Sequence, residues 1–325
     1  MLCAPFSFND CSLLMKNPPI ICLMGPTASG KTDLAFSLVD KLPCDIVSVD
    51  SAMIYKGMDI GTAKPSQAQL ASAPHRLIDI LDPSETYSAG QFCLDAHREI
   101  QSIWAKGRIP LLVGGTMMYF HALQQGLSPL PQADANVRKM LAQEADRLGW
   151  PALHQRLVEI DPVVGQRIDI NDKQRIQRAL EIYELTGKPA SDAFKQANPL
   201  FSSDQFFSIA LMPQDRQVLH GRIAQRFKEM LDKGLIEEVQ KLRQREDLSA
   251  DMPSLKTVGY RQVWAYLAGD LNAHEMKEKA VTATRQLAKR QLTWLKSWSH
   301  VQMFEACTPK LFADVYKTIL PKLHS

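Results

Sequence analysis

The sequence lacks the features that mark secreted, zinc-binding or membrane-spanning proteins. Its six cysteines are scattered along 325 residues without a C-x-x-C pair, which argues against a zinc site and against a disulfide framework. No apolar run approaches the roughly 20 residues that a bilayer-spanning helix needs. Residues 1–19 have no basic segment of the kind that opens a secretory signal. We therefore expect a cytoplasmic protein with no membrane partner.

A strong charge of either sign is also absent. The net charge is +3, hydrophobic residues make up 45% and charged residues 22%, the balance of an ordinary globular protein. This balance neither demands nor excludes nucleic acid, because a local basic surface can bind it whatever the sum. The length accommodates one large domain, or one domain with an insertion.

Short apolar runs alternate with helical patterns in the first third of the chain. The runs that read as buried strands are residues 20–24, 45–49, 77–81 and 109–113. Helical segments lie between them, for example residues 91–106. This alternation predicts an α/β protein, with a parallel sheet flanked by helices.

The pattern changes near Pro129, where prolines begin to punctuate successive short helices. These predicted helices cover residues 136–148, 151–160, 172–186 and 191–196. A strand at 206–212 returns the chain to the sheet, and long helices follow at 214–233, 235–244, 258–268 and 274–298. We predict a leader at residues 1–18, a core formed by 19–128 and 206–325, and an inserted all-helical domain at 129–205.

A glycine-rich turn follows the first predicted strand and precedes a helix. The pattern G-x-x-x-x-G-K-[ST] is met in full by Gly25, Pro26, Thr27, Ala28, Ser29, Gly30, Lys31 and Thr32. In such a P-loop, backbone N–H groups and the helix N-terminus surround a phosphate, the lysine adds a charge and the hydroxyl can ligate Mg²⁺. The motif predicts a P-loop NTPase-like fold that binds a diphosphate or triphosphate, without naming the reaction. The sequence has no N-K-x-D motif, which argues against a GTPase.

A carboxylate, Asp50, stands at the carboxyl end of the second predicted strand. Ligands bind at that edge of an open parallel sheet. Asp50 could act there as a general base or hold a metal ion. It could equally cap the turn that starts at Ser51, and position alone leaves these readings open.

Five stretches in order resemble the tRNA dimethylallyltransferase family. They are residues 25–32 in the form GPTASGKT, 50–65, 112–116, 178–187 and 284–294. Together they span roughly residues 20 to 300. The chain departs from the family at Met53, where many members carry a glutamine whose amide could bond the target base. Methionine can only pack against a base, so this contact differs here.

The resemblance implies transfer of a dimethylallyl group from dimethylallyl diphosphate to a tRNA. The acceptor is the exocyclic amine of the adenosine 3′-adjacent to the anticodon, in tRNAs that read codons beginning with U, and Mg²⁺ is required. The catalytic residues it implies are Lys31 and Thr32 on the diphosphate and metal, Asp50 as the base, and Arg226 on the diphosphate.

The resemblance also implies a tRNA-binding surface. It places contacts at Asp50, Ser51, Ala52, Met53, Thr116, Arg138, Gln174, Arg175, Ile176, Gln177, Arg178, Lys256, Thr257, Val258, Gly259, Tyr260 and Arg261. Arg175 and Arg178 are three residues apart and share a helix face, which fits an insertion that grips the anticodon stem-loop. The alternative is that these are ordinary surface arginines. We expect a monomer, because a two-domain chain can close around one stem-loop without a partner.

Other functions share the same motifs. A P-loop kinase of the nucleoside-monophosphate type would transfer phosphate from ATP and would close an arginine-rich lid. A non-catalytic RNA-binding regulator would not need Asp50. An enzyme that prenylates free adenylate would have no use for a second gripping domain.

Overall fold

The computed structural model describes residues 17–126, 128, 130–194 and 198–323. The predicted leader, residues 1–18, lies outside this part except for its last two residues. The chain divides into two compact units. The larger comprises Met1–His121 and Ser202–Ser325, and the smaller is Ala122–Phe201.

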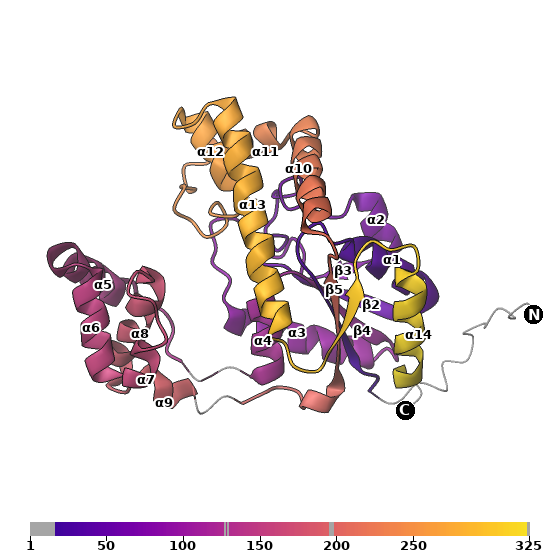
Figure 1. Cartoon of the computed structure of the whole chain (residues 1–325), viewed down its shortest axis with the longest axis horizontal. Helices are drawn as coiled ribbons and strands as arrows, with labels where there is room; N and C mark the ends of the chain where they lie inside the picture. Colours follow the sequence, from indigo (N-terminus) through magenta and orange to yellow (C-terminus); the bar gives the residue numbers. More distant parts are fainter. Residues whose placement is uncertain (1–16, 127, 129, 195–197, 324–325) are drawn as a thin grey trace, which may run out of the picture. The chain divides into compact units, whose positions relative to one another are not determined.

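The larger unit is built on a six-stranded sheet in the order β3-β2-β4-β1-β5-β6, with every pair parallel (Figure 1). The strands are β1 (Ile20–Met24), β2 (Cys44–Val49), β3 (His75–Arg76), β4 (Ile109–Gly114), β5 (Phe206–Met212) and β6 (Val301–Glu305). All five residues of β1 are fully buried, as the uninterrupted apolar run predicts for a strand covered on both faces. The predicted parallel α/β sheet is confirmed.

The edge strands differ from the sequence prediction. The third strand is His75–Arg76 and not residues 77–81, because Leu77 and Asp79 have φ of 61° and 55° and so leave the extended region. Arg76 instead forms ion pairs with Asp45 and Glu99. Strand β6 was not predicted; it is partly exposed along its length and carries no buried apolar run.

Helices cover both faces of this sheet. On one face, α1 (Lys31–Lys41) and α14 (Leu311–Leu323) share a core with β1, β2, β4 and β5. The chain returns from β3 to β4 through α3 (Ala89–Trp104), so a right-handed crossover puts this helix on the other face. The shorter helix α2 (Gln67–Ser72) belongs to the same unit, and α4 (Met117–Gln125) begins in it and ends in the smaller one. The 3₁₀ turn Ser203–Gln205 leads into β5.

Four helices form a second core beyond the carboxyl edge of the sheet. They are α10 (Arg216–Asp232), α11 (Leu235–Arg243), α12 (Tyr260–Ala268) and α13 (Ala273–Lys296). Their buried side chains pack with Ile54, Tyr55 and Met58 from the segment that follows β2. This core therefore fixes the chain directly after the candidate base, Asp50.

The smaller unit contains α5 (Ala135–Leu148), α6 (Trp150–Ile160), α7 (Pro162–Gly165), α8 (Lys173–Thr186) and α9 (Ala190–Phe194). It has its own core, in which Leu141, Leu153, Leu157 and Leu180 are buried. Across both units, none of the described helices has the length and apolarity that spanning a membrane requires.

A buried carboxylate ties α5 to α8 in the smaller unit. Glu181 accepts hydrogen bonds from Arg138 Nε (2.9 Å), Arg178 Nη1 (2.6 Å) and Asp134 N (2.8 Å), and its side chain is fully buried. Burial opposes its ionisation, but the bonds from the two arginines and from Asp134 N hold the pKa of Glu181 below its usual value.

We expect Glu181→Ala to destabilise the smaller unit by about 2 kcal/mol, because three part-buried donors lose their acceptor. Urea denaturation, with hydrogen exchange of the α5 and α8 amides, measures this loss. The control is Glu184→Gln, which removes a partly exposed partner of Arg156 and should cost less than about 1 kcal/mol. Equal, small losses in both variants would contradict the structural role of Glu181.

Candidate active site

The phosphate loop connects the central strand β1 to α1 and has a constrained backbone. Ala28 and Gly30 have φ of 63° and 83°, and the first of these is strained for a residue with a side chain. Arg222 Nε donates to Ala28 O at 2.9 Å, and Thr27 N donates to Gln291 Oε1 at 2.9 Å. Helices α10 and α13 thus hold the loop in a conformation that its own residues do not favour.

A close approach within the loop also constrains its residues. A Cβ at Gly25 would lie 2.7 Å from Ser29 Oγ, so only glycine fits there. Ser29 Oγ is buried and has no hydrogen-bond partner among the described residues. Buried hydroxyls normally find a partner, and an oxyanion in the loop is the kind of group that would supply one.

Lys31 folds back over the loop. Its Nζ donates to Gly25 O at 2.9 Å and to Pro26 O at 2.7 Å. Burial, followed by the nearby positive charge of Arg226, lowers the pKa of Lys31 to about 7, while Asp50 acts in the opposite direction. Near neutral pH the amine is therefore divided between its charged and neutral forms, and an oxyanion beside it would favour the charged form.

Three charged residues from separate parts of the sequence meet at this edge of the sheet. Arg226 of α10 is near enough to Asp50 and Lys31 for their charges to interact, and burial lowers the pKa of its guanidinium. Lys31 follows β1 and Asp50 follows β2, while Arg226 comes from a helix beyond β5. The predicted catalytic residues Lys31, Asp50 and Arg226 are thus brought together.

The carboxylate of Asp50 is fixed by the turn that it starts. Its Oδ1 accepts from Ala52 N at 2.9 Å and from Met53 N at 3.3 Å. Oδ2 has no hydrogen bond among the described residues. The capping role and the catalytic role considered for Asp50 are therefore compatible, because one oxygen holds the turn while the other can accept a proton.

The turn after β4 lies against the same segment. Thr116 Oγ1 accepts from Ser51 N at 3.0 Å, and Thr116 N donates to Val49 O at 3.2 Å. This approach requires Gly114, where a Cβ would lie 2.0 Å from Val49 O. Thr116 and the segment 50–53, predicted separately to contact tRNA, are therefore neighbours.

The later residues of the 50–65 motif have a structural role. Glu238 of α11 accepts from the backbone N of Asp59, Ile60 and Gly61 and from Tyr260 Oη at 2.6 Å. A Cβ at Gly61 would lie 2.4 Å from the Tyr260 ring, which accounts for that glycine. The sequence analysis did not identify Glu238, because no local pattern distinguishes it from the acidic residues found on the surface of any helix.

The other predicted tRNA contacts occupy two surfaces, one on each unit. In the smaller unit Arg138 and Arg178 bind Glu181, Gln177 Nε2 donates to Arg138 O, and Gln174 and Arg175 are exposed. Ile176 is fully buried in that unit's core, so its side chain does not face solvent.

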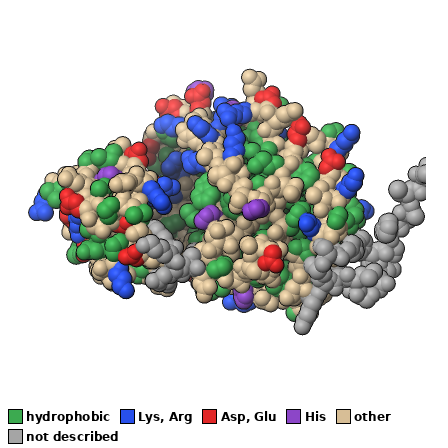
Figure 2. Space-filling model, turned by 60° about the horizontal axis from the view of Figure 1, so that its bottom comes forward, with side chains coloured by type: hydrophobic (Ala, Val, Ile, Leu, Met, Phe, Trp, Pro, Cys, Tyr) green, Lys and Arg blue, Asp and Glu red, His purple; other side chains and the backbone are tan. Residues whose placement is uncertain are grey.

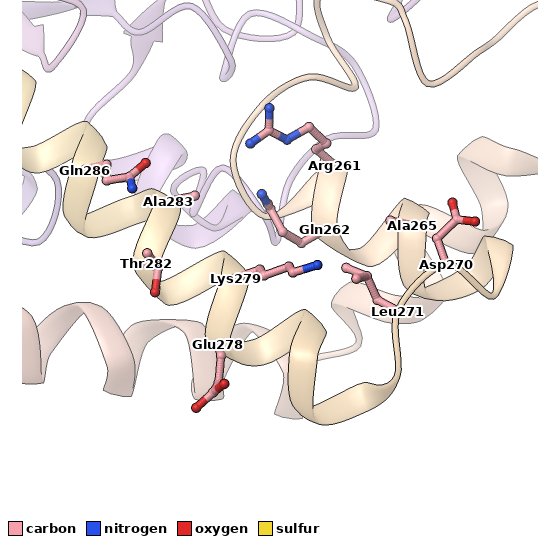
Figure 3. Close-up of a pocket in the computed structure, with 10 residues that line it drawn as sticks. All are labelled: Arg261, Gln262, Ala265, Asp270, Leu271, Glu278, Lys279, Thr282, Ala283 and Gln286. Carbon is pink, nitrogen blue, oxygen red and sulfur yellow. The ribbon is translucent and has the colours of Figure 1, made fainter.

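In the larger unit, the segment 256–261 leads into α12. Tyr260 is fully buried, whereas Lys256 and Arg261 are exposed. Arg261 lines a pocket of about 710 Å³ between α12 and α13, and Figure 3 shows Lys279 reaching from α13 towards α12 there. Figure 2 shows that Lys and Arg side chains gather on part of this unit. Thus only two residues of this segment present charge to a ligand.

The described residues include no group of three or more His, Cys, Asp or Glu side chains that could hold a metal ion. Thr32, in the first turn of α1, is half-buried beside Lys31. Mg²⁺ prefers oxygen ligands and commonly keeps waters and substrate phosphates in its shell. A single hydroxyl beside a phosphate loop fits that mode of binding and does not fit a metal held by protein alone.

Known proteins resemble this chain over nearly its whole length. Residues 53–298 match the sequence model of a family described as IPP transferase. The chain is 52% identical over 321 residues to tRNA dimethylallyltransferase 2 of Hahella chejuensis, covering 95% of this chain and 97% of that protein. It is 54% identical over 302 residues to a tRNA dimethylallyltransferase of Coxiella burnetii, covering 92% and 96%.

Solved structures agree with the sequence matches. The tRNA isopentenylpyrophosphate transferase of Bacillus halodurans has a TM-score of 0.68 and 35% identity, covering 94% of this chain and 97% of that one. A eukaryotic dimethylallyltransferase acting on tRNA has a TM-score of 0.77 and 25% identity, covering 92% and 77%. The family match, these identities and the site at the edge of the sheet lead to one conclusion: the chain belongs to the IPP transferase family.

Proposed function

We propose that this chain transfers a dimethylallyl group from dimethylallyl diphosphate to the exocyclic amine of the adenosine 3′-adjacent to the anticodon, in tRNAs that read codons beginning with U. The observation that carries the proposal is the meeting of Lys31, Arg226 and Asp50 beside the phosphate loop. Two cations and the amides of the loop can stabilise the negative charge of a diphosphate leaving group. A carboxylate can accept the proton that the amine must lose.

The phosphate loop binds the leaving group. An allylic C–O bond can ionise because the carbon cation is delocalised, and the oxygen side then gains negative charge. Loop amides between Gly25 and Thr32, the Lys31 ammonium and the Arg226 guanidinium stabilise that charge. Mg²⁺, held by the Thr32 hydroxyl and by the substrate, supplies further neutralisation when it is bound.

Asp50 acts on the acceptor. The lone pair of an adenine amine is conjugated into the ring, so the amine is a poor nucleophile until a base takes its proton. Asp50 Oδ2 accepts that proton, while Oδ1 stays bound to Ala52 N and Met53 N. The base must leave its stack to reach this site, which costs less in an anticodon loop than in a duplex.

Each unit contributes residues to the proposed tRNA contacts. Residues 50–53 and Thr116 meet the target nucleotide, and residues 256–261 present Lys256 and Arg261 to the backbone. The predicted insertion, residues 129–205, holds the anticodon stem through Arg138, Arg175 and Arg178. In this proposal the enzyme acts as a cytoplasmic monomer. A sedimentation run that shows a concentration-independent dimer would refute the last point.

The first experiment offers the protein two possible donor substrates. Purified protein is incubated with Mg²⁺ and unmodified tRNA, with radiolabelled dimethylallyl diphosphate in one arm and ATP in the other. We expect label in the tRNA without ATP. Phosphate release from ATP with no label transfer would instead favour the nucleoside-monophosphate-type kinase.

The variant Asp50→Asn separates the proposed role of Asp50 as a base from its role in holding the turn. Asparagine keeps an Oδ1 acceptor for Ala52 N and Met53 N but cannot take a proton at neutral pH, so we expect kcat to fall roughly 10²–10⁴-fold with little change in melting temperature. Asp50→Ala should lose the same activity and also some stability, because the cap is gone. Full activity in Asp50→Asn would remove Asp50 from the chemistry.

Lys31 gives a pH dependence to diphosphate binding. Its pKa is about 7 in the free enzyme, and a bound diphosphate raises it, so binding takes up a proton above pH 7. The affinity for dimethylallyl diphosphate should therefore fall by about tenfold per pH unit above pH 7 until the pKa of the complex is reached. Calorimetry at pH 8 in buffers of different ionisation enthalpy measures the uptake. Lys31→Met should abolish it; uptake that persists in this variant would assign the proton to another group.

A further inference from the structure

One buried amide joins the two halves of the active site. Gln291 of α13 is 7% exposed. Its Oε1 accepts from Thr27 N in the phosphate loop at 2.9 Å, and its Nε2 donates to Gly115 O, in the turn after β4, at 2.8 Å. A single side chain thus spans the loop for the leaving group and the turn beside the base.

The chemistry of these partners fixes the orientation of the amide. Thr27 N is a donor and Gly115 O is an acceptor, so the oxygen must face the loop and the nitrogen must face the turn. A Cβ at Gly115 would lie 2.5 Å from Gln291 Nε2, so any larger residue there would displace the amide. The contact is therefore both directional and tightly packed.

The connection continues to the catalytic carboxylate. Thr116, the residue after Gly115, accepts through Oγ1 from Ser51 N. Ser51 is joined to Asp50, whose Oδ1 accepts from Ala52 N and Met53 N. Hydrogen bonds and short backbone links therefore run from the phosphate loop through Gln291 to Asp50.

The same amide also assigns roles within the loop. Thr27 N donates to Gln291 of α13, so this amide is not available to a phosphate in the loop. Gln291 further stabilises the loop next to Ala28, whose φ of 63° is strained. Without this bond the loop is free to relax away from the turn after β4.

We propose that Gln291 is a positioning residue that sets the separation between the diphosphate site and Asp50. Transfer needs the allylic carbon and the adenine amine at near-contact distance, and a displacement of about 1 Å can cost about 100-fold in rate. The inference rests on the roles proposed above for the phosphate loop and Asp50. Gln291 touches neither reacting atom, so it acts through the two elements that it joins.

The test compares Gln291→Met with Gln291→Glu in full-length protein. Methionine fills similar space and loses both bonds, so we expect the single-turnover rate at saturating substrates to fall about 100-fold, with each KM within about threefold of the wild type. Ionised glutamate opposes Gly115 O, whereas protonated glutamic acid restores a donor and an acceptor. The rate of Gln291→Glu relative to wild type should therefore rise as pH falls, while the relative rate of Gln291→Met stays flat.

A charge control and a chemistry control accompany these variants. Gln240→Glu makes the same change on an exposed face of α11 and should match the wild type at each pH. Asp50→Asn, assayed alongside, tests the proposed base independently; if it is fully active, the assignment of the site fails and not only that of Gln291. A wild-type rate in Gln291→Met overturns the inference. The inference is also overturned if Gln291→Met and Gln291→Glu lose rate equally at every pH and their melting temperatures fall to match. That result would show that Gln291 only fills space in the core.

Discussion

The structure depends on the burial of β1 at the centre of a parallel sheet. Every residue of this strand is removed from solvent, and its neighbours β4 and β5 hold it from both sides. Parallel strands end at one edge, so the turns after β1, β2 and β4 emerge together. The phosphate loop, Asp50 and Thr116 lie at the start of those turns, and their proximity follows from the sheet.

The sheet alone does not complete the site. The strained loop at Ala28 and the half-buried cations Lys31 and Arg226 all cost free energy. Helices α10 and α13 offset part of that cost through Arg222 and Gln291, which form hydrogen bonds with the loop from much later in the chain. Glu238 does the same for the segment after β2, by accepting three backbone amides and the Tyr260 hydroxyl. The C-terminal helices are thus part of the active site as well as of the core.

Opposite charges are arranged differently in the two units. In the smaller unit Arg138 and Arg178 surround a single buried carboxylate, Glu181, and this cluster joins α5 to α8. In the larger unit Lys31 and Arg226 share Asp50, and burial lowers the pKa of both cations. The first cluster is satisfied within the protein. Each cluster sets two cations against one carboxylate, but only the second lies at the phosphate loop, where an anion can add negative charge.

Local patterns were enough to predict the fold class, the phosphate loop and the candidate base Asp50: apolar runs of strand length, glycine spacing and a carboxylate at a strand end. They failed at β3 and β6, where short, partly polar edge strands have no periodicity to detect and positive φ at Leu77 and Asp79 ended the third strand early. The partners of Gln291, Glu238 and Glu181, in contrast, are visible only in the folded chain. Those partners lie up to 264, 179 and 47 residues away along the chain, respectively, and no local pattern shows which polar side chain of a helix turns inward to meet a distant backbone.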